Sequence, residues 1–196
     1  GEQVVVVHGG SPQIDAALHA KGIISTWVGG FRVTTQEIFD VVEDVLVNHV
    51  GIEVAATLGR AGIKAQAMSA RTLPTVIANR RTALIDGTPV DLGFVGDVQR
   101  VDPSALLELL NQGIVPVVAP VSSDEDMKTG LNVNADFAAA AIAAIARGEG
   151  PNRLSFAPNR AKNPLPCSRS VVSGPTKGTV EGKEAASVVR QGVFIP

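Results

Sequence analysis

The sequence predicts an α/β protein built on a mainly parallel sheet that helices cover on both faces, with inserted β-hairpins. Two apolar runs rich in valine, at residues 4–7 and 114–119, have the character of strands buried on both faces. Helical patterns lie between these runs, and strands that alternate with helices are typical of parallel sheets. The Asp86-Gly87 pair, between two apolar stretches, is a hairpin turn signal.

The predicted helices have recognisable start and stop signals. The first, at residues 12–21, begins after a possible cap at Ser11 and stops at Gly22. The second begins with a capping-box pattern at Thr34 and Glu37. Its apolar positions recur at helical spacing and are Ile38, Val41, Val42, Val45 and Leu46. Further helices are expected at residues 52–60, 102–113, 136–147 and 182–190.

The remaining segments read as one more strand, two hairpins and loops. A strand is expected at residues 64–69, and two hairpin ribbons are expected within residues 82–101. Residues 122–130 form a polar loop. Residues 150–183 are rich in Pro, Gly, Ser and Asn and show little apolar periodicity, so they are expected to be loop.

Composition excludes several classes of function. The formal charge of −2 over 196 residues predicts no general affinity for nucleic acid or for anionic membranes. The single cysteine, Cys167, excludes an internal disulfide framework and fits a reducing, cytoplasmic compartment. No apolar run is long enough to span a bilayer. Because the chain opens almost inside a core strand, we expect that residues precede it in the natural protein.

The junction after the first strand predicts an anion site. Gly9 and Gly10 allow a sharp turn with bare N–H groups, and Pro12 suits the first turn of the following helix. A strand, a glycine turn and a helix N-terminus together suit a phosphate or a carboxylate. A tight connection without a ligand explains the same residues equally well. His8 is either an acid or base, or a side chain held by backbone hydrogen bonds.

Two later segments carry polar side chains suited to ligand recognition. Arg32 lies in a Gly-Gly-Phe-Arg-Val-Thr loop, and its planar guanidinium fits a carboxylate or phosphate; the alternative is a solvated loop arginine. Asn132 and Asn134 alternate after a polar loop and offer amide donors and acceptors. Asp136 follows at a helix start, where helix capping is the alternative to a functional role.

The order of four motifs resembles that of the amino acid kinase family. The motifs are Val-His-Gly-Gly-Ser-Pro, Gly-Phe-Arg-Val-Thr, Ile-Val-Pro-Val-Val-Ala-Pro and Asn-Val-Asn-Ala-Asp, and the resemblance spans residues 4–147. It implies a three-layer αβα sandwich with an acyl-amino-acid-binding lobe over residues 1–120. Residues 121–196 would be part of a nucleotide-binding lobe for ATP and Mg²⁺.

Within the family, the resemblance is to members that phosphorylate the side-chain carboxylate of N-acetyl-L-glutamate in arginine biosynthesis. It implies a catalytic role for Gly9, Gly10 and Asp136. The glycine N–H groups would contact the reacting carboxylate and the transferring phosphoryl group, and Asp136 would organise cationic catalytic groups. Catalysis would then rest on positioning and charge stabilisation.

The same resemblance implies the substrate contacts. Gly9 and Gly10 would bind the acceptor, Arg32 would hold its α-carboxylate, and Asn132 and Asn134 would contact the acetylamino acid. No residue is assigned to the nucleotide or to a metal. Family members are dimers or larger, so a homodimer or higher homo-oligomer is expected, with the apolar second helix as a candidate interface.

The chain departs from the family pattern at two lysines. The family has a Lys-x-Gly-Gly motif before the point where this sequence opens, and a catalytic lysine after an Ile-Pro pair like the one at its end. We therefore expect the 196-residue chain alone to be nearly inactive. Two alternatives remain: a non-catalytic, kinase-like regulatory domain that binds arginine or a related amino acid, and an unrelated α/β binding module.

Overall fold

A parallel three-stranded core organises the main sheet of the computed structural model, which describes residues 3–85, 87–146, 187–190 and 193–195. The strands lie in the order β11-β10-β1-β7-β4. Strand β1 pairs in parallel with β7, which pairs in parallel with β4, whereas β10 pairs antiparallel with β1. Their bounds are β1 Val4–Val7, β4 Ala65–Ser69, β7 Val115–Ala119, β10 Ser187–Arg190 and β11 Val193–Ile195.

The expected helix at residues 182–190 is wrong where the structure describes it. Residues Ser187–Arg190 form β10, whose register places Val189 opposite Val5 of β1. Consecutive valines favour a strand over a helix, and the edge of β1 supplies the pairing partner. Residues 182–186 of this expectation lie outside the described residues, as does the expected loop at 150–183.

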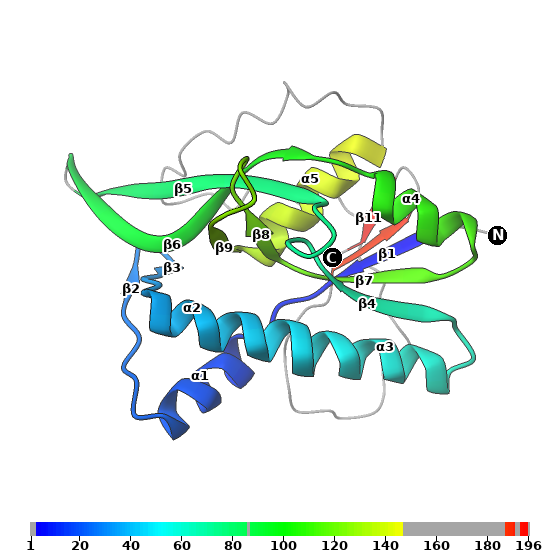
Figure 1. Cartoon of the computed structure of the whole chain (residues 1–196), viewed down its shortest axis with the longest axis horizontal. Coiled ribbons are helices and arrows are strands. Elements are labelled where there is room, and N and C mark those ends of the chain that lie inside the picture. Colours follow the sequence, from blue (N-terminus) through cyan, green and yellow to red (C-terminus); the bar gives the residue numbers. More distant parts are fainter. Residues whose placement is uncertain (1–2, 86, 147–186, 191–192, 196) are drawn as a thin grey trace.

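Helices cover both faces of this sheet, as Figure 1 shows. On one face lie α1 (Ser11–Ala20), α2 (Gln36–Glu43) and α3 (Gly51–Arg60). On the other lie α4 (Ser104–Asn111) and α5 (Ala135–Ala146), with α5 against β1. The predicted αβα sandwich is therefore confirmed. No helix in the described part of the chain is both long and apolar enough to cross a membrane.

Helices α2 and α3 form one continuous rod, where the sequence predicted two helices. A π-helical stretch, η1 (Asp44–Val50), joins them without a break. The α2 cap is also one residue later than predicted: Thr35 accepts the N–H of Ile38. The α1 cap is Gly10 rather than Ser11, and no side chain caps that helix.

A small closed barrel stands beside the sandwich and is built from β5, β6, β9 and β8. Strands β5 (Val76–Ile85) and β6 (Thr88–Val101) form one long hairpin, so the prediction of two ribbons within 82–101 is wrong. The second ribbon is the far half of β6, which pairs back with residues 76–80. Strands β8 (Val121–Ser123) and β9 (Gly130–Val133) close the barrel.

The expected loop at residues 122–130 is partly strand, because Ser122 and Ser123 are fully buried in β8. The division into lobes at residue 120 stays a prediction. In the described part, β8 and β9 pair with β5 and β6, and α5 packs on β1. Residues 121–146 thus share the core of the residues before them.

Candidate functional site: an anion cradle at the end of β1

Two helix N-termini meet at the glycine pair after β1. Gly10 is the N-cap of α1, and a Cβ on Gly9 would lie 3.9 Å from the Cβ of Ala135, the first residue of α5. The first N–H groups of a helix lack partners within the helix, and the dipole there favours negative charge. The described backbone therefore brings two anion-attracting helix ends to one turn.

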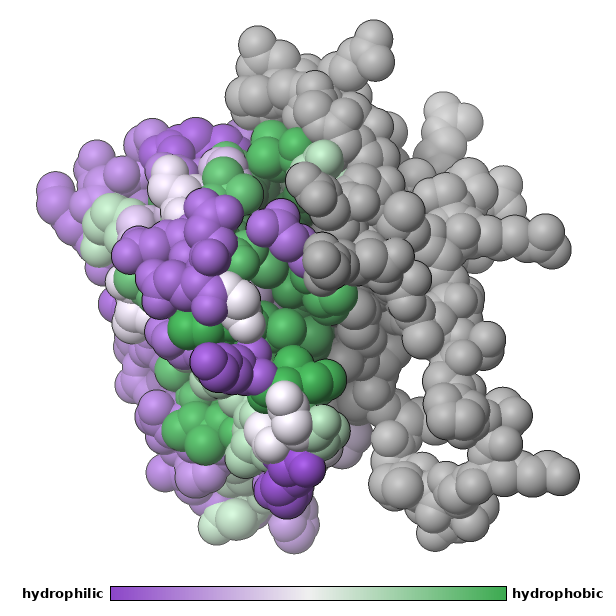
Figure 2. Space-filling view, turned by 90° about the vertical axis from the view of Figure 1, so that its right-hand side faces the viewer, coloured by the Kyte–Doolittle hydropathy of each residue, from purple (hydrophilic) through white to green (hydrophobic). Residues whose placement is uncertain are grey.

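The amino ends of the strands, on the opposite side of the sheet from Gly9, form a more apolar surface. A shallow hollow of about 530 Å³ lies there, lined by Gly59, Ile63, Lys64 and their neighbours at the amino end of β4. Figure 2 views the end of the fold that carries α4 and shows apolar residues exposed between polar ones. Exposed apolar side chains include Ile63 and Leu107. Ligands of open parallel sheets bind at the carboxyl ends of the strands, where Gly9 lies.

Gly10 also has a packing role. A Cβ at this position would lie 2.6 Å from Cδ2 of Leu46, a buried residue of η1. Its φ of 178° is extended backbone, so the requirement for glycine is steric. The close approach brings the start of α1 against the helix rod, which fixes where the N–H groups of the turn lie.

Arg32 is buried, with 4% of its surface exposed, so the alternative of a solvated loop arginine is wrong. It ends β3 (Phe31–Arg32), which pairs with β2 (Trp27–Val28). Its Nη1 donates to Asp15 Oδ1 at 2.8 Å and to Ser25 Oγ at 2.5 Å. Its Nη2 is buried and has no acceptor among the described residues. A buried guanidinium N–H without a partner is costly, and a carboxylate would satisfy it.

Thr34 joins the two predicted motifs. Its hydroxyl donates to the carbonyl oxygen of Arg32 at 2.8 Å and accepts the amide of Asn132 at 3.5 Å. Its own backbone pairs with β6, since its N–H donates to Leu92 and its carbonyl accepts from Phe94. Arg32 and Asn132, a hundred residues apart in sequence, are thus brought to one place through a buried threonine.

The other two predicted residues lie at the start of α5. Oδ1 of Asn134 accepts the N–H groups of Asp136 at 2.9 Å and Phe137 at 3.2 Å, so Asn134 is the helix cap. The alternative that Asp136 caps the helix is wrong. Its side chain is exposed, and no described residue forms an ion pair with its carboxylate. Asp136 thus places a negative charge in the first turn of α5.

His8 is held inside the fold. Its ring Nδ1 lies 2.9 Å from the carbonyl oxygen of Gly9, and its backbone N–H donates to Val118. Burial lowers the pKa of His8 below its ordinary value because the charged form loses its hydration. Nε2 is buried without a partner among the described residues and faces Gly51, where a Cβ would lie 3.1 Å away. The backbone-held alternative describes His8 best.

Reasoning from sequence missed the groups that surround Arg32. Trp27 lies directly across the hairpin from it, and the guanidinium carbon is 4.5 Å from the indole centroid. Gly29 and Gly30, both with positive φ, form the turn that sets this register. A two-glycine turn between apolar residues is a hairpin signal, so the Trp27–Arg32 pairing could have been found. Asp15 and Ser25 carried no comparable signal.

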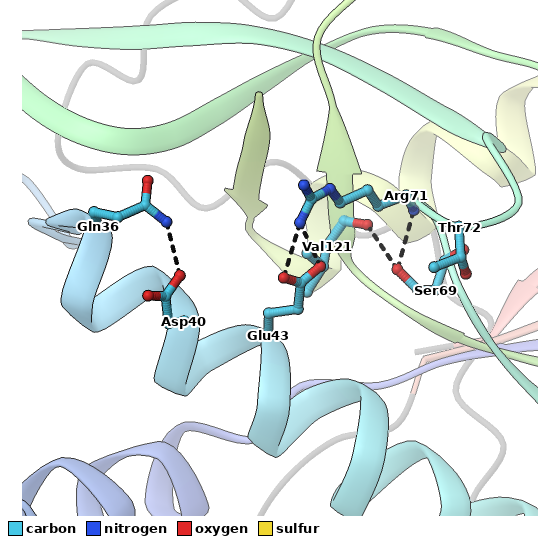
Figure 3. A network of polar contacts seen from close by, with 7 residues as sticks. All are labelled: Gln36, Asp40, Glu43, Ser69, Arg71, Thr72 and Val121. Atoms are coloured by element: carbon cyan, nitrogen blue, oxygen red, sulfur yellow. Dashed lines mark hydrogen bonds and ion pairs between the residues drawn. The ribbon is translucent and has the colours of Figure 1, made fainter. Parts of the chain in front are cut away.

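A second arginine, Arg71, helps to connect the secondary-structure elements around the site. Arg71 follows β4, and its Nη1 donates to both carboxylate oxygens of Glu43 at 2.7 and 2.8 Å, as Figure 3 shows. The same figure shows Ser69 Oγ donating to the carbonyl oxygen of Val121 and accepting the N–H of Arg71. These contacts tie α2 and β4 to the barrel strand β8, next to the strand that carries Asn132.

The fold and the site together define an α/β domain with a parallel sheet, whose strands carry groups suited to an anion at their carboxyl ends. The chain belongs to the amino acid kinase family, whose family model matches residues 1–149. It is 46% identical over 143 residues to an acetylglutamate kinase of Nocardia farcinica, covering 73% of this chain and 47% of that protein. It is 48% identical over 145 residues to the acetylglutamate kinase of Bifidobacterium adolescentis, covering 74% and 46%. The chain thus spans about half the length of the curated relatives it matches.

Solved structures agree on the fold. The crystal structure of smu.665 from Streptococcus mutans matches with a TM-score of 0.63 and 28% identity, covering 72% of this chain and 55% of that chain. An N-acetylglutamate synthase from Neisseria gonorrhoeae, complexed with coenzyme A and N-acetyl-glutamate, matches with a TM-score of 0.56. Its 22% identity, over 74% of this chain and 31% of that chain, bears on the fold alone.

Proposed function

We propose that this chain is the acceptor-binding part of an acetylglutamate kinase, which uses ATP to phosphorylate the side-chain carboxylate of N-acetyl-L-glutamate in arginine biosynthesis. The observation that carries the proposal is the buried Arg32, whose Nη2 lacks an acceptor among the described residues. The names of the similar kinases, at 45–48% identity, support N-acetyl-L-glutamate as the carboxylate ligand.

The acceptor would lie between the two ends of this site. Arg32 would bind the α-carboxylate through Nη2, and the Asn132 amide, held near Thr34, would contact the acetylamino group. The side-chain carboxylate would then face Gly9 and Gly10 at the meeting point of α1 and α5. Asn134 contributes by capping α5: its Oδ1 accepts the N–H groups of Asp136 and Phe137 and so fixes the start of this helix.

The chemistry needs no strong base, because a carboxylate is already nucleophilic. The described backbone N–H groups would stabilise the negative charge that spreads over the transferring phosphoryl group. His8, buried and with a lowered pKa, stays neutral and supports the turn. We propose that the exposed Asp136 organises cationic groups of the complete site.

The described residues do not fit Mg²⁺ by themselves. In the ranges that the structure describes, no group of three or more His, Cys, Asp or Glu side chains could hold a metal ion. The donors at the turn are N–H groups, which suit anions. We therefore propose ATP and Mg²⁺ as co-substrate and cofactor of the whole protein and assign no described residue to them.

Isothermal calorimetry with N-acetyl-L-glutamate, L-arginine and ATP tests the proposal on the full 196-residue chain. We expect N-acetyl-L-glutamate to bind and Arg32→Met to abolish binding. Arg60→Met is the matched control, because Thr57, on the exposed side of α3, is the one partner of Arg60 among the described residues. Binding of arginine without N-acetyl-L-glutamate would establish the regulatory domain instead. Binding of neither would refute both proposals and leave a member of the amino acid kinase family that takes another ligand.

Activity is tested on the whole protein by trapping the acyl phosphate with hydroxylamine. The kinase proposal predicts hydroxamate formation that requires both ATP and N-acetyl-L-glutamate. A whole protein that binds N-acetyl-L-glutamate and forms no hydroxamate would refute the catalytic proposal and leave the binding proposal intact.

A further inference from the structure

We propose that Asp15 and Trp27 are positioning residues that orient Arg32, so that its Nη2 receives a ligand carboxylate. The identity of the ligand rests on the proposed function, whereas the orientation of Arg32 rests on contacts within the chain. Neither side chain needs to touch the ligand for this role.

Asp15 and Ser25 fix the rotation of the guanidinium within its own plane. Both accept from Nη1, Asp15 Oδ1 at 2.8 Å and Ser25 Oγ at 2.5 Å. Asp15 lies on α1, one turn after its start, and Ser25 lies in the segment between α1 and β2. The position of Nη1 is therefore tied to the same helix whose N-terminus forms the glycine turn.

Trp27 fixes the plane itself. The guanidinium carbon lies 4.5 Å from the indole centroid, within the range of a cation–π contact. The hairpin register sets the two residues directly opposite each other. With the plane set by the ring and the rotation set by Nη1, the direction of Nη2 is determined before any ligand arrives.

The hydrogen-bond partners of the two terminal nitrogens of Arg32 indicate that this arrangement is suited to binding a ligand. Nη1 has two acceptors, whereas Nη2 is buried with none among the described residues. A fully buried arginine with a purely structural role is expected to have acceptors for both nitrogens, because a buried N–H without one is costly. The Asp15 side chain is 57% exposed, so solvent screens its charge and Arg32 remains attractive to a second anion.

The positioning role predicts a loss of affinity that depends on the ligand carboxylate. The ligands are N-acetyl-L-glutamate and its α-carboxamide analogue, which differ only at the group that Arg32 would bind. We expect Asp15→Ala to weaken N-acetyl-L-glutamate about tenfold, the size of one charge-assisted hydrogen bond, and to leave the analogue unchanged. Asp15→Asn keeps a side-chain oxygen acceptor and is expected to recover most of the affinity.

The electrostatic sign separates this role from a simple charge effect. If Asp15 acted only by lowering the positive potential of Arg32, its removal would strengthen anion binding, which would overturn the proposal. Equal losses for both ligands would also overturn it, since they indicate a general structural defect. Asp40→Ala is the matched control: Asp40 is an exposed helical aspartate that accepts from Gln36 (Figure 3).

A ligand-independent readout separates the failure of this inference from the failure of the proposed function. Trp27 is the single tryptophan of the chain, so its fluorescence reports the Arg32 contact. We expect Asp15→Ala to change the fluorescence emission of Trp27 and to shift the NMR resonances of the Arg32 side chain. Both signals are also recorded while acetate is added as a simple carboxylate probe. Wild type that responds to acetate and ignores N-acetyl-L-glutamate would refute the proposed substrate and keep the positioning role. An unchanged Trp27 emission in Asp15→Ala would refute the positioning role alone.

Discussion

The substitution Gly130→Ala tests whether the barrel closes against the helix rod as the structure shows. Gly130 begins β9, and a Cβ there would lie 2.6 Å from Cε1 of Phe39, closer still to Cζ, and 3.0 Å from Nη1 of Arg71. Carbon atoms in contact prefer about 3.5–4.0 Å, so the overlap is about 1 Å or more. Phe39 is 2% exposed and packs against Phe94, with ring centroids 6.0 Å apart, so its ring has no open space to enter.

Overpacking a filled core lowers the free energy of unfolding by about 1–3 kcal/mol. Because both neighbours of the added Cβ are held in place, we expect Gly130→Ala to lower it by about 3 kcal/mol. Arg71 resists displacement because Glu43 holds its Nη1. Urea denaturation of the full chain measures the free energy of unfolding. Gly59→Ala is the control. Outside its own stretch of α3, no described residue lies within 4 Å of the added Cβ, and α3 gains up to about 1 kcal/mol of helix propensity. Equal or greater stability of Gly130→Ala relative to wild type would refute the packing described here.

Three further predictions concern the site. Gly93→Ala, at a φ of 73°, would drive its Cβ into the carbonyl oxygen of Thr34, so we expect a loss of at least about 2 kcal/mol in urea denaturation, together with weaker N-acetyl-L-glutamate binding; an unchanged stability would contradict the Thr34–β6 contact. Asn134→Ala removes the α5 cap and should cost about 1 kcal/mol, seen as a lower urea midpoint, whereas Asn48→Ala on the exposed helix surface should not. The lowered pKa of His8 means that the unfolded state binds its proton first, so stability is full above the ordinary pKa of 6.5 and falls as the pH drops below it; His8→Gln should flatten this part of the unfolding profile, and an equal slope in both proteins would contradict the burial of His8.

Local patterns predicted the parts of the fold that depend on neighbours in sequence. The valine run, Gly9 and Gly10 gave β1 and its turn, and Gly22 gave the end of α1, where φ is 69°. Pairing between distant segments was not predictable in the same way. Ser122 and Ser123 look like loop residues, and their burial follows from the pairing of β8 with β9 and β5. The β10 strand likewise depends on the free edge of β1.

The same division applies to the site. Residue type singled out Arg32, Asn132 and Asn134 as candidate ligand contacts, but in the structure these residues have different roles. Asn134 supports a helix end through its own cap, which a local motif can predict. Arg32 stacks on Trp27 and is linked to Asn132 through Thr34, and the only role that the sequence suggested for Thr34 was that of a helix cap.

Thr34 holds together the end of the site that we propose binds a carboxylate. The Gly93 bridge holds the backbone of Thr34 against β6, while its side chain is fixed between Arg32 and Asn132. Gly93 has no Cβ to separate the two chains, and its positive φ brings its backbone close to Thr34. The orientation of Arg32 is therefore set from two sides, by α1 through Asp15 and by the barrel through Thr34. Side chains that are already held in place lose little conformational entropy when a ligand binds. A preorganised site of this kind therefore binds a small dicarboxylate more tightly than a site whose side chains become ordered only on binding.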